Sequence, residues 1–431
     1  MRGGLWVLRH CLWLGLFSLC INSCSDEDEQ RPEIRVTFPS AGAYFEVLDT
    51  IRVGLEITDD RDLEYVEVKL LDENARLSSS VATEFPSGAV YSGIMEITTS
   101  DKYLQSGSYI INIKIFDGTN ERFEFIRVSL GALPKNRKSL EVITGEGNVS
   151  AYSVDSLGQV SLRALLPHDA GSFCIDNRHD QGFVIGNVDG EISSLDLENG
   201  GIVWENSWSN QPPAPAFLAV TCDNGDVLIS GYDHIILGYN QNGDLILNKE
   251  TTAAYRPQEL IVVKEHLLVE QVQSGTNNHF MFWYNRESMA IQSNVSVPID
   301  VVAITPLNEE SVLIFGNDNG QARVFQYSYF ENVIWEPRTL EPGSVIDAVK
   351  SNGNTYFIAQ SDGIYAYTFL PNFLNFIVPS VVSTGLKFDT DRGVLLSSSS
   401  NMIQEYTTAG TLITTHQFSE DVVSFDFHYT K

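Results

Sequence analysis

The feature that most constrains the fold of this chain is an internal repeat in its second part. Short apolar strands, each ending near Gly, Ser or Gln, start at residues 140, 183, 227, 267, 312, 356 and 394. Each unit continues with a strand carrying an aromatic residue or Leu, then a third strand, then a fourth apolar strand before the next unit. Four strands per unit at a period of roughly 40 to 45 residues indicate β-propeller blades.

The order of these strands also predicts how the ring closes. No apolar strand of the fourth kind precedes the first unit, and the last apolar stretch, 422–427, has no unit after it. We therefore expect the C-terminal strand to complete the first blade as its innermost strand, which leaves no unpaired edge at the seam. Residues 139–431 are thus predicted to form a seven-bladed β-propeller closed by the C-terminal strand.

The part before the repeat alternates apolar and polar residues in several short segments, among them 51–57, 65–70 and 109–115. Alternation with period two predicts strands that bury one face. Six or seven short strands in about 100 residues are typical of an immunoglobulin-like sandwich. We expect an all-β chain, with this sandwich at 33–130 and a Gly- and Pro-containing linker at 131–138.

The N-terminus has the pattern of a secretory signal. Arg2 and Arg9 accompany an apolar stretch at 11–21, and small polar residues precede Cys24. The stretch is shorter than the roughly 20 residues that a membrane-spanning helix needs. We expect a signal peptide at 1–23 and an acidic, solvated tether at 24–32.

Residues 21–24, Ile-Asn-Ser-Cys, resemble a bacterial lipoprotein signal, which implies acylation of Cys24 and attachment to outer-membrane lipid. The blades resemble WD40-like and quinoprotein-like propellers, best in 194–205, without implying a quinone or another cofactor. The first domain resembles Ig-like domains of bacterial surface lipoproteins. An acidic run resembles the surface-export signal of Bacteroidota lipoproteins, with a plain solvated spacer as the alternative; it comprises Ser25, Asp26, Glu27, Asp28 and Glu29.

The charge and the motifs argue against several functions. With 27 basic and 56 acidic residues, the net charge of −29 repels nucleic acid. No catalytic residues and no metal site are predicted, because metal-ligand spacings, a Walker loop and a nucleophile elbow are missing. The histidines of the mature part are expected on the surface or in loops. Asp59, Asp60 and Asp62 are expected to form a turn, with calcium binding as the alternative.

Two cysteines, Cys174 and Cys222, lie in the repeat, whereas Cys11, Cys20 and Cys24 belong to the signal region. Cys174 stands one position before the place that matches Cys222 in the aligned strands. Successive side chains point to opposite faces of a strand, so the two thiols are expected on different faces. Two buried thiols, rather than a disulfide, are predicted.

Two segments are predicted partner surfaces, because exposed apolar clusters mark such surfaces. The alternative is packing against a neighbouring blade or the sandwich. One segment contains Trp208, Pro212 and Pro213, and the other contains Phe369, Phe373 and Phe376. Thr50 and Ser156, each after an Asp, resemble the O-glycosylation motif of Bacteroidota.

These features together predict a surface-exposed outer-membrane lipoprotein. It would act without catalysis, as a binding or scaffold module for another envelope protein or a glycan. One alternative is a propeller enzyme that acts on polysaccharide, with its active site in the mouth of the channel. Another is a periplasm-facing factor in outer-membrane assembly.

Overall fold

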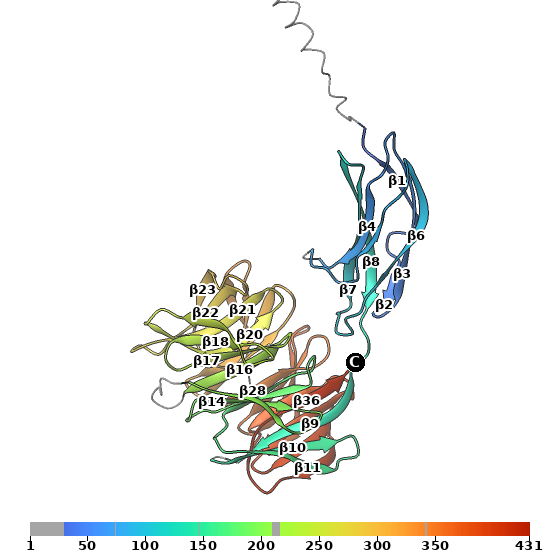
Figure 1. Cartoon of the computed structure of the whole chain (residues 1–431). Coiled ribbons are helices and arrows are strands. Elements are labelled where there is room, and N and C mark those ends of the chain that lie inside the picture. Colours follow the sequence, from blue (N-terminus) through green and yellow to red (C-terminus); the bar gives the residue numbers. More distant parts are fainter. Residues whose placement is uncertain (1–29, 74, 146, 209–215, 341–342) are drawn as a thin grey trace, which may run out of the picture. The chain divides into compact units, whose positions relative to one another are not determined.

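The computed structural model describes residues 30–431, except 74, 146, 209–215 and 341–342 (Figure 1). All regular elements of the described residues are strands, which confirms the predicted all-β class. A helix of the length and apolar character that membrane crossing requires is not found among them. The chain divides into two compact units, Met1–Pro134 with Lys431, and Lys135–Thr430.

The first unit contains two sheets that share one apolar core. The core takes alternate residues of the strands, such as Val66 and Val68 from one sheet and Ile51 and Val53 from the other. All strand pairs are antiparallel except the parallel pair β2–β8. The sheet orders are β1(Glu33–Phe38)-β3(Thr50–Thr58)-β6(Val90–Thr98) and β2(Tyr44–Glu46)-β8(Glu121–Gly131)-β7(Gly107–Phe116)-β4(Tyr65–Leu71)-β5(Ala82–Glu84).

The described residues of the second unit form seven four-stranded antiparallel sheets (Figure 1). Six of them consist of four consecutive strands, as the repeat predicts. These are β12(Ser172–Asp176)-β13(Gln181–Ile185)-β14(Glu191–Asp196)-β15(Ile202–Ser207), β16(Phe217–Asp223)-β17(Asp226–Gly231)-β18(Ile235–Tyr239)-β19(Leu245–Glu250), β20(Tyr255–Val263)-β21(His266–Gln273)-β22(Asn278–Asn285)-β23(Ile291–Val297), β24(Asp300–Pro306)-β25(Ser311–Asp318)-β26(Gln321–Ser328)-β27(Val333–Thr339), β28(Val345–Lys350)-β29(Thr355–Gln360)-β30(Gly363–Thr368)-β31(Phe373–Pro379) and β32(Gly385–Asp389)-β33(Val394–Ser399)-β34(Met402–Thr407)-β35(Leu412–Gln417).

The remaining sheet joins the two ends of the repeat region, in the order β11(Val160–Leu166)-β10(Val149–Asp155)-β9(Asn136–Thr144)-β36(Val422–Thr430). The C-terminal strand pairs with β9, with Phe427 opposite Leu140. The first strands of consecutive sheets neighbour one another, and β36 contacts both β32 and β12. We call β12, β16, β20, β24, β28, β32 and β36 the inner strands. This organisation is consistent with a β-propeller.

The segment between the units is shorter than the stretch expected as a linker. β8 ends at Gly131 and β9 begins at Asn136, so residues 136–138 belong to a strand. Arg137 is buried there between the carboxylates of Asp389 and Glu405. Arg137 is therefore part of the packed interior of the second unit and does not belong to a solvated loop.

Cys174 and Cys222 form a disulfide with their Cα atoms 5.9 Å apart, so the prediction of two free thiols is wrong. Cys174 lies on the face of its sheet that carries Phe183, and Cys222 lies on the face that carries Ile229. These two faces pack against each other. One face of each sheet packs against the opposite face of the next sheet. Two cysteines that point to different faces of their own sheets can therefore meet in the interface between the two sheets.

Candidate functional site

Charged side chains on the inner strands form the candidate functional site. Glu259 lies in β20, Asp347 in β28, Lys387 in β32 and Asp426 in β36, each within an otherwise largely apolar strand. Charges at such positions cost free energy unless they are paired, so they are candidates for function. We call these four residues the inner-strand charge group.

Asp347 ties two inner strands together. Its Oδ2 accepts a hydrogen bond of 2.6 Å from the backbone N–H of Leu386, and its Oδ1 accepts one of 2.7 Å from Ala348. Burial raises the pKa of Asp347, although these N–H groups and Lys387 act in the opposite direction. Lys387 itself lies 3.7 Å from Asp426, Nζ to Oδ2, in a loose and partly exposed ion pair.

Glu259 sits in an irregular part of β20. The register with β21 shifts between Pro257 and Leu260, so Gln258 and Glu259 have no paired residue, as in a β-bulge. Glu270 closes the gap by accepting the N–H of Glu259 at 3.4 Å. Burial raises the pKa of Glu259 to about 8, and the negative charges of Glu270 and Asp347 contribute. The surroundings of Glu259 therefore favour its protonated form.

A histidine connects this region to solvent. His279 is buried, with Nδ1 2.6 Å from Oε1 of the fully buried Glu270 and Nε2 2.8 Å from Oδ1 of Asp300. Burial lowers the pKa of His279, but the two carboxylates outweigh burial and raise it overall. Asp300 is 64% exposed, so the line from Asp300 through His279 to Glu270 runs from solvent into the protein.

Three histidines depart from the expectation that histidines would lie on the surface or in loops. His279, His416 and His428 are buried within strands, each with a carboxylate near at least one ring nitrogen, whereas the buried His168 lies in the loop between β11 and β12. The inner-strand charge group was also missed from the sequence. The sequence does contain a signal for this group, because a single charged residue such as Asp347 stands within an otherwise apolar inner strand.

This arrangement can hold a proton on Glu259, close to the carboxyl groups of Glu270 and Asp347. A carboxylic acid that stays protonated at neutral pH can donate a hydrogen bond or a proton to a ligand. The group can therefore bind a polar ligand or take part in proton transfer.

Replacing Glu259 with Gln should stabilise the second unit at alkaline pH. The pKa of Glu259 is about 8 in the folded chain and 4.5 as a free side chain, so its protonated form favours folding and stability is lost as pH rises between these values. At pH 9 the free energy of unfolding of Glu259→Gln should be at least about 1 kcal/mol higher than that of the parent. At pH 4 the two chains should have the same free energy of unfolding.

Urea denaturation followed by tryptophan fluorescence measures this effect, because every Trp outside residues 1–23 lies in the second unit. Glu309→Gln is the matched control, since Glu309 is 72% exposed and should change stability by less than about 0.5 kcal/mol. Equal stability of Glu259→Gln and the parent at pH 9 would contradict the prediction.

The residues predicted as sites are scattered over the structure. Cys24, the run Ser25 to Glu29, Pro212 and Pro213 lie outside the described residues. Trp208 is half-buried and packs against the apolar cluster around the disulfide, as in the packing alternative. Thr50 and Ser156 are both exposed.

The aromatic segment at 369–376, in the turn after β30 and in β31, divides between the core and the surface. Phe369 packs against the apolar core between two sheets. Phe373 and Phe376 remain 57% and 47% exposed. Phe376 stacks on Tyr365 with the ring centroids 4.6 Å apart.

The turn after β3 contains Asp59 and Asp60. The Oδ1 of Asp59 accepts the N–H of Asp60 at 2.9 Å, and burial raises the pKa of Asp59. Within the described part of the chain, the His, Cys, Asp and Glu side chains that lie close enough to share a metal ion are elsewhere, at Asp180, Glu198 and His428.

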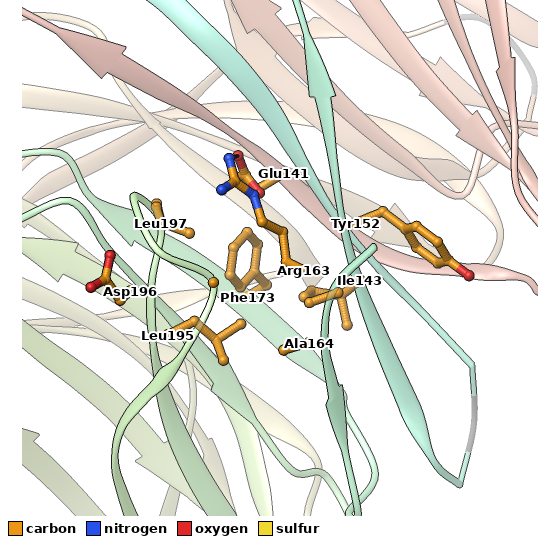
Figure 2. Close-up of a pocket in the computed structure, with 11 residues that line it drawn as sticks. Glu141, Ile143, Tyr152, Arg163, Ala164, Phe173, Leu195, Asp196 and Leu197 are labelled. Carbon is orange, nitrogen blue, oxygen red and sulfur yellow. Dashed lines mark ion pairs between the residues drawn. The ribbon is translucent and has the colours of Figure 1, made fainter. Parts of the chain in front are cut away.

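Two cavities differ in what they can hold. Figure 2 shows the first, between the β9–β11 and β12–β15 strands, where Arg163 faces Glu141 at 3.7 Å. Its volume of about 10 Å³ admits about one water molecule. The second has about 380 Å³, the size of a small-ligand site. It lies at the turns beside β32 and β33 and is lined by Ser380, Val381, Val382, Thr384, Ser399, Ser400 and Gln404.

No protein-family model and no curated protein matches this chain. Among solved structures, it is similar to a quinonprotein alcohol dehydrogenase-like protein from Bacteroides thetaiotaomicron, with 11% identity, a TM-score of 0.48, and coverage of 92% of this chain and 99% of that one. It is also similar to the computationally designed Ika8 protein (12%, TM-score 0.47, 67% and 90%) and to a chain of the mitotic checkpoint complex (12%, TM-score 0.48, 60% and 81%).

Proposed function

We propose that this chain is a lipid-anchored protein of the outer membrane that faces the cell exterior and binds a protein or glycan partner without catalysis. The observation that carries the proposal is the disulfide between Cys174 and Cys222. Disulfides persist in oxidising compartments outside the cytosol. The signal-like stretch before Cys24 supports the same destination, and the acyl chains on Cys24 provide the anchor.

In this proposal the first unit is an immunoglobulin-like spacer and the second is a seven-bladed propeller. The shared core of two sheets supports the first assignment. The contacts of β36 with both β32 and β12 support a ring that the C-terminal strand closes. A closed ring holds the turns at the ends of its strands rigidly, and such turns are common binding surfaces.

The cavity of about 380 Å³ is the best candidate for the binding surface. Its hydroxyl and amide side chains, with Val381 and Val382, suit an uncharged polar ligand such as a glycan. Val382 is 65% exposed, so Val382→Asp should leave folding intact. We expect it to weaken partner capture from detergent-solubilised outer membrane at least about tenfold.

Leu412→Asp is the matched control for that capture, because Leu412 is 50% exposed on another strand. It should capture the same partner as the parent. Undiminished capture by Val382→Asp would remove this cavity from the proposal.

The anchor is tested at Cys24. We expect the parent chain to fractionate with the outer membrane and Cys24→Ala to appear in soluble fractions, because the thiol that carries the lipid is gone. Ser25→Ala keeps the thiol and should remain bound. A membrane-bound Cys24→Ala chain would refute the anchor.

Protease treatment of intact cells separates the outward orientation from the periplasm-facing alternative. An outward-facing chain is degraded, whereas a periplasm-facing chain survives until the outer membrane is permeabilised. Survival in intact cells would favour a role in outer-membrane assembly.

A second candidate function is cleavage of a polysaccharide, which the raised pKa of Glu259 favours. A protonated Glu259 would serve as the general acid of the reaction. Turnover of a glycan by the purified chain, abolished in Glu259→Gln, would support it. Absence of turnover across a glycan panel would leave the binding role.

A further inference from the structure

The cavity beside β32 and β33 continues an apolar interface between two sheets. Leu395 of β33 and Tyr406 of β34 lie in the core that these strands share with Phe357 of the neighbouring sheet. Side chains two positions apart point to the same face of a strand, so Ser399 and Gln404 lie on this face as well. Both residues line the cavity. Its polar groups are therefore carried by strand residues that the packed core holds in place.

The amide of Gln404 is oriented by one hydrogen bond. The hydroxyl of Tyr406 donates to Oε1 of Gln404 at 2.9 Å. Burial raises the pKa of Tyr406, so this hydroxyl keeps its proton and remains a donor. Among the described residues, no acceptor is found for the Nε2 of Gln404. Gln404 therefore offers its N–H donors to the cavity.

The hydroxyls that line the cavity are of two kinds. Two of them are engaged within the protein, because Oγ1 of Thr384 lies 3.0 Å from Oγ of Ser398 and Oγ of Ser400 donates to Oδ1 of Asp421 at 2.8 Å. For the Oγ of Ser399, no partner is found in the part of the chain that the structure describes. A hydroxyl both donates and accepts hydrogen bonds, so Ser399 can accept one from a ligand.

Two valines form the apolar part of the cavity. Val381 packs against the core between the sheets, whereas Val382 is 65% exposed and lies where the cavity meets solvent. None of the described residues that line the cavity carries a charge. A charged ligand would lose hydration there without gaining an ion pair. An uncharged ligand with a small apolar group therefore fits this set of side chains.

We propose that this cavity binds one N-acetylated sugar unit through its acetamido group, an inference that rests on the proposed glycan-binding role. The carbonyl oxygen of an acetamido group accepts from the Gln404 amide, and its N–H donates to the Ser399 hydroxyl. Its methyl group packs against the two valines, an apolar contact that a sugar hydroxyl in the same place would not make. The volume of about 380 Å³ lies near the lower end for small-ligand sites. It therefore suits a single sugar unit, with the rest of the glycan leaving past Val382.

The test is saturation-transfer NMR of the detergent-solubilised full chain with N-acetylglucosamine, N-acetylgalactosamine, glucose and galactose. We expect at least one acetylated sugar to bind with a dissociation constant of about 1 mM or tighter. Its acetyl methyl group should receive the strongest saturation, because that group lies against the valines. The corresponding plain sugar should bind at least about tenfold more weakly, because it leaves the Gln404 and Ser399 groups unpaired.

Gln404→Glu keeps the size of the side chain but replaces its N–H donors with a carboxylate oxygen. It should weaken binding of the acetylated sugar at least about tenfold. Gln292→Glu is the matched control, because Gln292 is exposed on β23 of another sheet, and it should bind like the parent. If urea denaturation shows that Gln404→Glu does not fold, Val382→Asp decides the question, since it changes an exposed residue and should weaken binding to the same extent.

The outcomes separate this inference from the proposed function. Equal binding of the acetylated and plain sugars overturns the inference and leaves a glycan site in place. Binding of none of the four sugars also overturns it, and capture of the membrane partner by the parent and by Val382→Asp then decides the proposed function independently. Undiminished binding of the acetylated sugar by a folded Gln404→Glu chain overturns the assigned contacts and with them the inference.

Discussion

Replacing both Cys174 and Cys222 with Ala should lower the free energy of unfolding of the second unit by about 4 kcal/mol. The disulfide spans 48 residues of sequence, so its loss frees a long loop in the unfolded chain. It also removes the covalent link between β12 and β16, which contact each other at the apolar cluster around Phe183.

Urea denaturation followed by tryptophan fluorescence measures the loss, since Trp204, Trp208, Trp283 and Trp335 all lie in the second unit. Trp204 and Trp208 pack beside the disulfide and report on it directly. The parent treated with a reductant should match the double variant, and the same reductant should leave the variant unchanged. A loss below about 1 kcal/mol would show that the neighbouring sheets hold together without the bond.

Arg137→Met should destabilise the second unit by about 3 to 5 kcal/mol. Arg137 is 2% exposed, with Nη1 3.1 Å from Asp389 and Nη2 2.9 Å from Glu405. Its guanidinium also lies over the ring of Phe427, 5.3 Å from the centroid. Methionine would fill the volume but leave two buried carboxylates without their cation.

The cost should depend on pH in a defined direction. Burial raises the pKa of Glu405, but His416 and Arg137 outweigh burial and lower it to about 2. A carboxyl with a lowered pKa stabilises the fold above its unfolded pKa of about 4.5, and the contribution is lost as pH falls toward 2. The difference between the parent and Arg137→Met should therefore shrink as pH falls below about 4.5.

Denaturation of both chains between pH 3 and pH 7 checks this dependence. Lys264→Gln is the matched control, because Lys264 and Glu309 form an ion pair with side chains 43% and 72% exposed. Its loss should cost less than about 1 kcal/mol at any pH. A difference for Arg137→Met that stays constant with pH would remove Glu405 from the explanation.

Much of the fold could be predicted because strand patterns are local. In β4 the residues Tyr65–Leu71 alternate in burial, as their apolar–polar alternation predicts. The apolar strands that begin the seven repeat units each lie next to the inner strand of their sheet: β9, β13, β17, β21, β25, β29 and β33. The pairing of 422–427 with β9 also followed from counting strands. In each case the information lies within one segment or in the order of segments.

The candidate site could be predicted much less well. Glu259 and Glu270 are close in sequence, but Asp347 acts on Glu259 from a strand almost 90 residues away. His279 is expected on the surface or in a loop from the sequence. Its carboxylate partners come from separate strands, so their closeness to His279 is not visible in the sequence. Whether a lone charge is solvated or buried depends on which sheets flank it.

The sequence by itself determined that the chain is built of strands, where its repeat units begin, and which strand joins the two ends of the repeat region. Alternation and repeat spacing carry this information, since each strand buries one face wherever the sheets lie. The tertiary structure alone decided that Cys174 bonds Cys222, that Arg137 is a buried cation, and that Asp180, Glu198 and His428 meet. These contacts form at interfaces between sheets, and packing brings together residues that are up to about 270 positions apart.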